Sequence, residues 1–355
     1  MIFTLAQAIF FCFCIAIFIC DAHAQSGRRN EPKTPPRSAP RQPGPIAEPV
    51  RSPGSAKDTT AKKNPDDDFD TGDVVHITSN LVPIPASIFD QKGVAVTGLK
   101  LDDFELLVDG QVRPLTDLTR TETTVRMAML FDNSGSLDFA REFEKQAATH
   151  FFRRVMRPVD EAAIYSVETE SYLAQPLTHD VTKLEQTIQN FGKPEGSTSL
   201  FDAIIDAAAY LRPYVGRKVL VIVSDGIETT SRADFETTMQ KVLAYDCQIF
   251  VVQTGMYEGA NVRALAAERR MEQLSGQTGG AVYLPKSIPE LNSAFEQIAA
   301  DLAQQYVLSY YPGSDQRDGR FHGLELRVKS RKDVRVRSRK GYYSPKPAAA
   351  SATGW

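Results

Sequence analysis

The sequence predicts an α/β fold in which a doubly wound, mainly parallel six-stranded sheet is inserted in a small β-sandwich. Three observations support this fold class. Apolar strand-like runs alternate with amphipathic helical stretches from Arg126 onward, strand-like runs precede this region, and strand-like runs return after it. Because strands that alternate with helices build a parallel sheet covered on both faces, the middle of the chain is expected to form the α/β part.

The first segment, residues 1–24, is expected to be a signal peptide. No charged side chain occurs from Ile2 to Cys20, and Ala22 and Ala24 give the A-x-A pattern of a cleavage site. The apolar run is also close to the roughly 18 residues that would let it remain as a membrane anchor. The sequence therefore predicts an exported protein of the periplasm, outer envelope or extracellular medium, with a retained N-terminal tether as the alternative.

Composition bounds the remaining chain. Hydrophobic residues make up 42% and charged residues 24% of the 355 residues, as in globular proteins, and the formal net charge of −3 gives no sign of a polyanion binder. Three of the four cysteines lie in the first 20 residues, so a mature chain would keep only Cys247 and form no internal disulfide. Residues 25–71 are rich in Pro and polar residues and are expected to form a disordered linker, and residues 346–355 a disordered tail.

Residues 72–124 and 306–345 are expected to supply the two halves of the β-sandwich. Strand-like runs occur at 74–77, 81–88, 104–108, 306–311, 324–329 and 334–337. Apolar and charged residues alternate in the last two runs, as in strands with one buried face. Because a two-stranded hairpin is only marginally stable alone, the two segments are expected to pack together.

Residues 125–305 are expected to form the α/β domain. Its six strands are predicted at 127–131, 162–167, 172–177, 218–224, 248–252 and 281–284. Its helices are predicted near 137–155, 181–190, 199–211, 232–245, 262–275 and 288–304. In the last helix, apolar residues recur at steps of three to four residues, which indicates one buried stripe.

Oxygen-bearing side chains follow the ends of two predicted strands and precede one helix. They are Asp132, Ser134 and Ser136 after the first α/β strand, Thr198 before the helix at 199–211, and Asp225 after the strand at 218–224. In open α/β sheets, ligands bind at the carboxyl ends of strands where the strand order reverses. Two carboxylates and several hydroxyls suit Mg²⁺ or Mn²⁺ better than Zn²⁺. The alternative is a polar loop in which Thr198 or Ser197 is only a helix N-cap.

These residues carry a resemblance. The segment Asp132-Asn133-Ser134-Gly135-Ser136 resembles the DxSxS motif of von Willebrand factor A (VWA) domains, Thr198 falls where the metal-site Thr of that family lies, and Ser224-Asp225-Gly226 is similar to its Asp-Gly turn. The resemblance covers roughly residues 125–305, and the flanking segments resemble a group of exported bacterial VWA-related proteins. Glu228 departs from the family pattern, since many relatives carry Asp in that segment.

The resemblance implies a VWA or Rossmann-like fold with a metal ion-dependent adhesion site. Ser134, Ser136 and Thr198 would be direct ligands of Mg²⁺, Mn²⁺ or Ca²⁺, and Asp132 and Asp225 direct or water-mediated ligands. The implied function is a non-enzymatic protein-binding or adhesion module of the cell envelope, in which the ion coordinates an Asp or Glu side chain of a protein partner.

Two alternatives stay open. A metal-dependent envelope hydrolase or assembly factor is one, although Ser134 stands where a phosphatase would carry a second acid and no G-x-S-x-G elbow surrounds it. Neither G-x-x-x-x-G-K-[ST] nor G-x-G-x-x-G occurs, so no nucleotide is expected. A polyanion-binding module is the other, although nucleic acid is not favoured; its basic residues would be Arg327, Lys329, Arg331, Lys332, Arg335, Arg337, Arg339 and Lys340.

Overall fold

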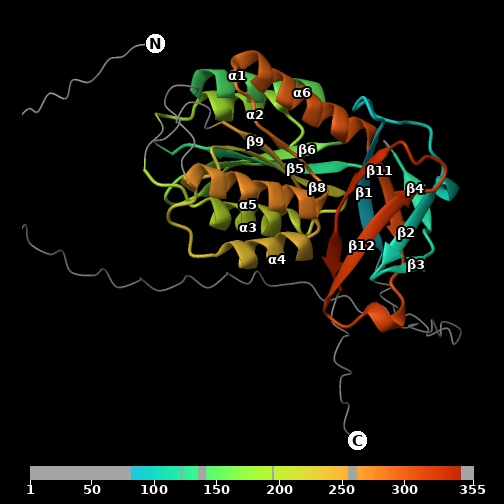
Figure 1. Ribbon diagram of the computed structural model, residues 1–355. Helices are drawn as coiled ribbons and strands as arrows, with labels where there is room; N and C mark the ends of the chain where they lie inside the picture. Colours follow the sequence, from blue (N-terminus) through green and yellow to red (C-terminus); the bar gives the residue numbers. More distant parts are fainter. Residues whose placement is uncertain (1–80, 121–122, 135–140, 194–195, 255–261, 345–355) are drawn as a thin grey trace, which may run out of the picture. The chain divides into compact units, whose positions relative to one another are not determined.

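Six strands form the central sheet of the computed structural model in the order β10-β9-β8-β5-β6-β7 (Figure 1). They are β5 (Val125–Asp132), β6 (Glu161–Val167), β7 (Tyr172–Thr178), β8 (Arg217–Ser224), β9 (Cys247–Gln253) and β10 (Val282–Tyr283). All neighbouring pairs are parallel except β6 and β7. The structure describes residues 81–120, 123–134, 141–193, 196–254 and 262–344.

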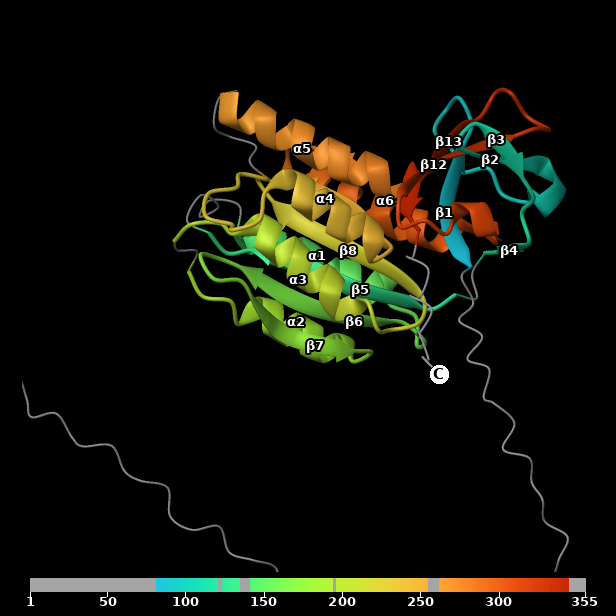
Figure 2. The same cartoon turned by 90° about the horizontal axis from the view of Figure 1, so that it is seen from below.

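Helices cover both faces of this sheet (Figures 1 and 2). Helices α1 (Arg141–Val155), α2 (Val181–Gln189) and α6 (Ile288–Gln304) pack on one face, and α3 (Leu200–Leu211), α4 (Phe235–Ala244) and α5 (Val262–Thr278) pack on the other. The predicted doubly wound, mainly parallel six-stranded sheet is therefore confirmed.

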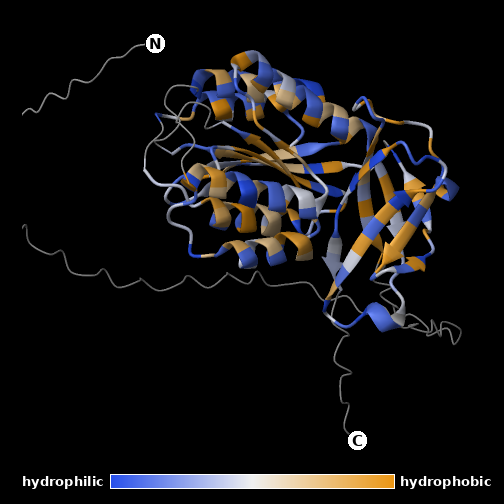
Figure 3. Ribbon diagram, viewed as in Figure 1, coloured by the Kyte–Doolittle hydropathy of each residue, from blue (hydrophilic) through white to orange (hydrophobic). Residues whose placement is uncertain are grey.

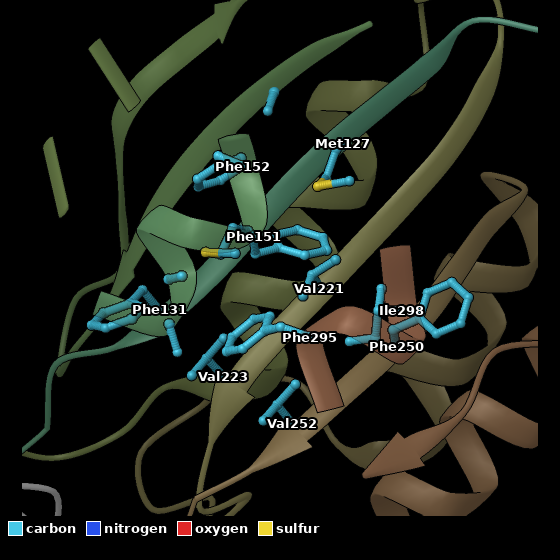
Figure 4. Close-up of a cluster of buried hydrophobic side chains, with 14 of the residues drawn as sticks. Met127, Phe131, Phe151, Phe152, Val221, Val223, Phe250, Val252, Phe295 and Ile298 are labelled. Carbon is cyan, nitrogen blue, oxygen red and sulfur yellow. The ribbon is translucent and has the colours of Figure 1, made fainter. Parts of the chain in front are cut away.

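The strands are buried on both faces, which explains why they read as continuous apolar runs. In β5, Phe131 lies in the core under α1 and α6, whereas Leu130 lies in the core under α3. Figure 4 shows the first of these cores, where Phe131, Val223 and Phe295 come from β5, β8 and α6. Figure 3 shows that the sheet strands are hydrophobic along most of their length, whereas the helices also carry hydrophilic residues.

The flanking segments form two four-stranded sheets, with the orders β13-β1-β11-β4 and β14-β12-β2-β3. Their strands are β1 (Val82–Phe89), β2 (Phe104–Val108), β3 (Gln111–Arg113), β4 (Asp117–Thr119), β11 (Tyr306–Tyr310), β12 (Phe321–Val328), β13 (Arg335–Ser338) and β14 (Gly341–Tyr343). Side chains of both sheets share one hydrophobic core. The predicted sandwich, built from segments on both sides of the α/β domain, is therefore confirmed.

Three short strands of the sandwich were not among the predicted ones. The sequence did not predict β3, β4 and β14, each of which has three residues. A 3-10 turn (Leu101–Asp103) also precedes β2. The strand predicted at 74–77, the signal peptide, the linker and the tail lie outside the described residues.

A buried polar network joins the α/β domain to the sandwich. The Arg217 guanidinium, at the start of β8, donates to the carbonyl of Leu302 in α6 at 3.0 Å and to the Gln305 side chain. Gln305 in turn donates to the Ser87 hydroxyl of β1 at 3.0 Å. Among the described residues, no helix combines the length and the apolar character that a membrane crossing requires.

Candidate metal centre

The two predicted acidic ligands lie at the ends of adjacent strands. Asp132 is the last residue of β5 and Asp225 directly follows β8, and their exposed fractions are 0% and 6%. In the sheet, β6 and β7 lie on one side of β5, and β8, β9 and β10 lie on the other side. The strand order therefore reverses beside β5. The carboxylates therefore lie at the kind of position where open α/β sheets bind ligands.

Two neighbouring groups fix the Asp132 carboxylate. Its Oδ1 accepts the backbone N–H of Ser134 at 2.9 Å, and its Oδ2 accepts the hydroxyl of Ser224 at 2.5 Å. Burial and the charge of Asp225 raise the pKa of Asp132, hydrogen bonds from the two serines lower it, and the resulting pKa is about 6. The arrangement thus holds the Asp132 carboxylate in a fixed position where burial disfavours its ionised form.

A tight turn orients Asp225. Its Oδ1 accepts the N–H of Ile227 at 2.8 Å, and its carbonyl accepts the side-chain amide of Gln253 at 3.0 Å. Gly226, with φ of 78°, adopts a left-handed conformation that most side chains avoid, and its N–H donates to Ser224 at 2.9 Å. The sequence Ser-Asp-Gly after β8 therefore builds the turn that presents this carboxylate.

Thr198 is held against the loop that follows Asp225. Its N–H donates to the Thr229 hydroxyl at 2.8 Å, and its carbonyl accepts the N–H groups of Thr229 and Thr230 at 3.0 and 3.2 Å. Thr198 is 4% exposed. The N-cap of α3 is Ser199, with no capping bond from its side chain, so the alternative in which Thr198 or Ser197 is the N-cap is wrong.

Glu228 has a structural role that the sequence did not reveal. Its carboxylate accepts the N–H of Phe201 in the first turn of α3 at 3.0 Å. It also accepts the N–H groups of Thr230 and Ser231 at 2.8 and 2.7 Å. Negative charge is favourable at a helix N-terminus, so Glu228 fixes the Thr198 segment and the loop after β8 to each other.

Of the five predicted ligands, the structure places Asp132, Ser134 and Asp225 at the ends of β5 and β8, and Thr198 on the adjoining loop. Ser136 lies outside the described residues, so the complete ligand set stays a prediction. Within the described ranges, no three His, Cys, Asp or Glu side chains form a group that could hold a metal ion. An ion here would need hydroxyl and water oxygens besides the two carboxylates, which is how Mg²⁺ is commonly bound.

Two charged residues that the sequence analysis did not single out lie in α1 near these carboxylates. Arg141 donates to the Asp132 carbonyl at 2.6 Å and to the Asn133 side chain, and its guanidinium lies 4.4 Å from the centre of the Phe131 ring. Glu144 is 1% exposed. The sequence signal for these residues is that Arg141 and Glu144 are charged, lie three residues apart and fall on the buried side of the helix.

Glu144 is buried without a hydrogen-bond partner for either carboxylate oxygen among the described residues. Burial and the charges of Asp132 and Asp225 raise its pKa, the charge of Arg141 lowers it, and the resulting pKa is about 7. The Thr254 hydroxyl is near enough to lower the pKa, but no hydrogen bond of normal geometry joins it to Glu144.

These pKa shifts predict that metal-free protein is more stable at pH 5 than at pH 8. Asp132 and Glu144 bind protons more tightly in the folded chain than their ordinary pKa values of 3.8 and 4.5 allow. The contribution of the two groups to the free energy of unfolding is therefore fully present below about pH 4 and is lost as the pH rises through about 6 to 7. Melting temperatures measured in chelator across this range test the prediction; a rise in melting temperature from pH 5 to pH 8 would contradict it.

Two hollows on the surface of the described residues bear on the candidate site. The larger, of 970 Å³, lies between α5, α6 and β13, and no predicted ligand lines it. The smaller, of 470 Å³, is lined by Ser199, Asp202 and Thr230 among others. Ser199 directly follows Thr198 in the chain, so the smaller hollow lies beside the candidate site.

The basic C-terminal residues do not form one free face. Strands β12 and β13 belong to different sheets. Arg327 pairs with Glu325 at 2.7 Å, Arg331 with Asp333 at 2.6 Å and Arg337 with Asp301 at 2.5 Å, and Arg339 pairs with Asp246. Because half of the eight residues have acidic partners, the structure gives no support to the polyanion-binding alternative.

No protein-family model matches the sequence, and no curated protein matches it. Similar solved structures include the PilB minor pilin from Streptococcus sanguinis, with a TM-score of 0.43 and 12% identity over 52% of this chain and 63% of the pilin chain. They also include the conserved hypothetical protein BatB from Bacteroides thetaiotaomicron, with a TM-score of 0.41 and 16% identity over 50% of this chain and 97% of BatB.

The SpRpn10 VWA domain is a further neighbour, with a TM-score of 0.37 and 14% identity over 49% of this chain and 95% of that domain. One of these neighbours is therefore a VWA domain. The α/β fold class itself follows from the strand order and from the helices on both faces.

Proposed function

We propose that this chain is a non-enzymatic, cation-dependent protein-binding or adhesion module of the cell envelope. A Mg²⁺-type ion, held by Asp132, Ser134, Ser136, Thr198 and Asp225, would coordinate an Asp or Glu side chain of a protein partner. The observation that supports this most is the meeting of Asp132 and Asp225 at the carboxyl ends of adjacent parallel strands. The envelope location rests on the export signal predicted at residues 1–24.

The donor set fits a hard divalent cation. Asp132 and Asp225 supply carboxylate oxygens, and serine and threonine hydroxyls supply neutral oxygens, which suit Mg²⁺, Mn²⁺ or Ca²⁺. Burial and the Asp225 charge disfavour the ionised form of Asp132. A bound cation would supply the positive charge that favours this form and that attracts an acidic side chain from outside.

The chain's own residues would position the ligands. The Ser224 hydroxyl and the Ser134 N–H orient the Asp132 carboxylate. The Ile227 N–H orients Asp225, and Glu228 fixes the loops on which Thr198 and Asp225 lie. The 470 Å³ hollow beside Ser199 leaves room for side chains that flank the partner's acidic residue.

Affinity capture tests this function. The full chain is immobilised and exposed to envelope extract in Mg²⁺ and, in parallel, in chelator, and the Asp132→Ala variant is treated in the same way. We expect capture of a protein partner only by the unmodified chain with Mg²⁺. If chelation and Asp132→Ala leave capture unchanged but remove activity on a small phosphoester, the metal-dependent hydrolase is the better explanation.

A further inference from the structure

We propose that Arg141 and Glu144 set the charge of the metal centre: the Glu144 carboxylate offsets the Arg141 guanidinium, so that a divalent cation is attracted to the two aspartates. Glu144 would act as a positioning residue through its charge and would not be a ligand. This inference rests on the proposed metal-binding function and deepens it.

Arg141 brings a fixed positive charge to the centre. Its guanidinium contacts the Asp132 carbonyl at 2.6 Å and lies against the Phe131 and Phe191 rings, with centroid distances of 4.4 and 5.8 Å. It is 4% exposed, so water screens its charge weakly. Alone, this guanidinium would neutralise one aspartate and repel a divalent cation.

Glu144 lies three residues further along α1, and Arg141 is the cation whose charge it senses most directly. Its exposed fraction is 1%, and neither oxygen has a hydrogen-bond partner within the described ranges. It also senses the charges of Asp132 and Asp225. A buried carboxylate without hydrogen bonds depends on nearby positive charge for its ionised form, here Arg141 and, in the metal-bound protein, the cation as well.

The charges balance when a divalent ion is present. Asp132, Asp225 and Glu144 carry three negative charges when ionised, and Arg141 carries one positive charge. A divalent cation brings the sum over these four groups to zero, whereas the same four positions with a neutral residue at 144 would hold one excess positive charge. Glu168, which accepts the Asn133 side-chain amide at 2.9 Å and whose charge also acts on Arg141, adds one negative charge in both cases. Because Glu144 does not join Asp132 and Asp225 in a three-residue ligand group among the described residues, its effect on the ion would be exerted through space.

The experiment measures Mn²⁺ and Mg²⁺ dissociation constants of the full chain by calorimetry. We expect Glu144→Gln to weaken binding by about tenfold or more, as loss of a residue behind the ligands commonly does. Arg141→Met should tighten binding, and the double variant should return the dissociation constant toward that of the unmodified chain. Glu144→Asp, which keeps the charge, should lose less affinity than Glu144→Gln.

A second measurement separates this role from a purely structural one. Glu144→Gln removes an unpartnered buried carboxylate, so the metal-free variant should melt at a higher temperature than the unmodified chain at pH 8, although it binds metal more weakly. A purely structural residue would lower the melting temperature. Glu142→Gln is the matched control, since it removes the same charge from an exposed side chain of the same helix.

Three outcomes decide the matter. Weaker metal binding by Glu144→Gln, reversed in the double variant, supports the inference. A dissociation constant unchanged within twofold, in a chain that does bind Mn²⁺ through Asp132, overturns the inference and leaves the proposed function intact. If the unmodified chain binds neither Mn²⁺ nor Mg²⁺, both fail.

Discussion

Asp132→Asn is expected to abolish the stabilisation of the folded chain by Mg²⁺ or Mn²⁺. A ligand that binds only the folded state at a concentration 100 times its dissociation constant adds about 2.7 kcal/mol to the free energy of unfolding. Asn keeps an oxygen that can accept the Ser134 N–H but removes the charge that attracts the ion. Binding should therefore weaken by about 100-fold or more, and the added stabilisation should fall close to zero.

Thermal and urea unfolding with and without Mn²⁺ measure this change. Asp180→Asn is the matched control, because Asp180 caps α2 through the N–H groups of Thr182 and Lys183 and Asn caps a helix equally well. The control should keep the full response to Mn²⁺. A response of Asp132→Asn equal to that of the control would show that Asp132 is not a ligand and would remove the basis of the proposed function.

Most of the fold could be predicted because its main elements have strong local patterns. Strand β5 is a continuous apolar run since both of its faces are buried, and α6 shows a stripe of buried residues at helical spacing. The strands β3 and β14 could not be predicted, because three residues are too few to show a period. They pair with β2 and β12, and these pairings become visible only in the folded chain.

The candidate site was predictable where it depends on the ends of strands. Asp132 and Asp225 follow apolar runs directly, so their meeting at one edge of the sheet follows from the α/β pattern. Glu228 was not predictable in the same way, because its contact with α3 is made to the N–H of Phe201, 27 residues away in the sequence. The importance of Glu144 likewise depends on the surroundings into which α1 turns it.

For the basic C-terminal residues, the sequence pattern was misleading. Its spacing suggested a charged face, but the acidic partners of Arg337 and Arg339 are Asp301 in α6 and Asp246 after α4. These partners are distant in sequence, so spacing alone could not reveal them. Arg337 and Arg339 thus lie at the junction between the sandwich and the α/β domain. The contribution of this junction to the stability of the fold can be tested at a third arginine.

Arg217→Met is expected to lower the free energy of unfolding by about 3 kcal/mol, since it leaves two buried acceptors without a donor. These acceptors are the Leu302 carbonyl, in the last turn of α6, and the Gln305 side chain. Burial lowers the pKa of Arg217 to about 10, yet the side chain stays charged at neutral pH, and a cation is favourable at the C-terminus of a helix.

Urea unfolding followed by far-UV circular dichroism measures the loss, and two further variants identify its cause. Arg217→Lys keeps the charge but not the forked guanidinium, so an intermediate loss is expected. Arg153→Met removes an arginine whose side chain is 60% exposed and pairs with Glu185, and should cost about 1 kcal/mol or less. If Arg217→Met shifts the midpoint no more than Arg153→Met does, the buried network from Arg217 through Gln305 to Ser87 does not hold the two parts of the fold together.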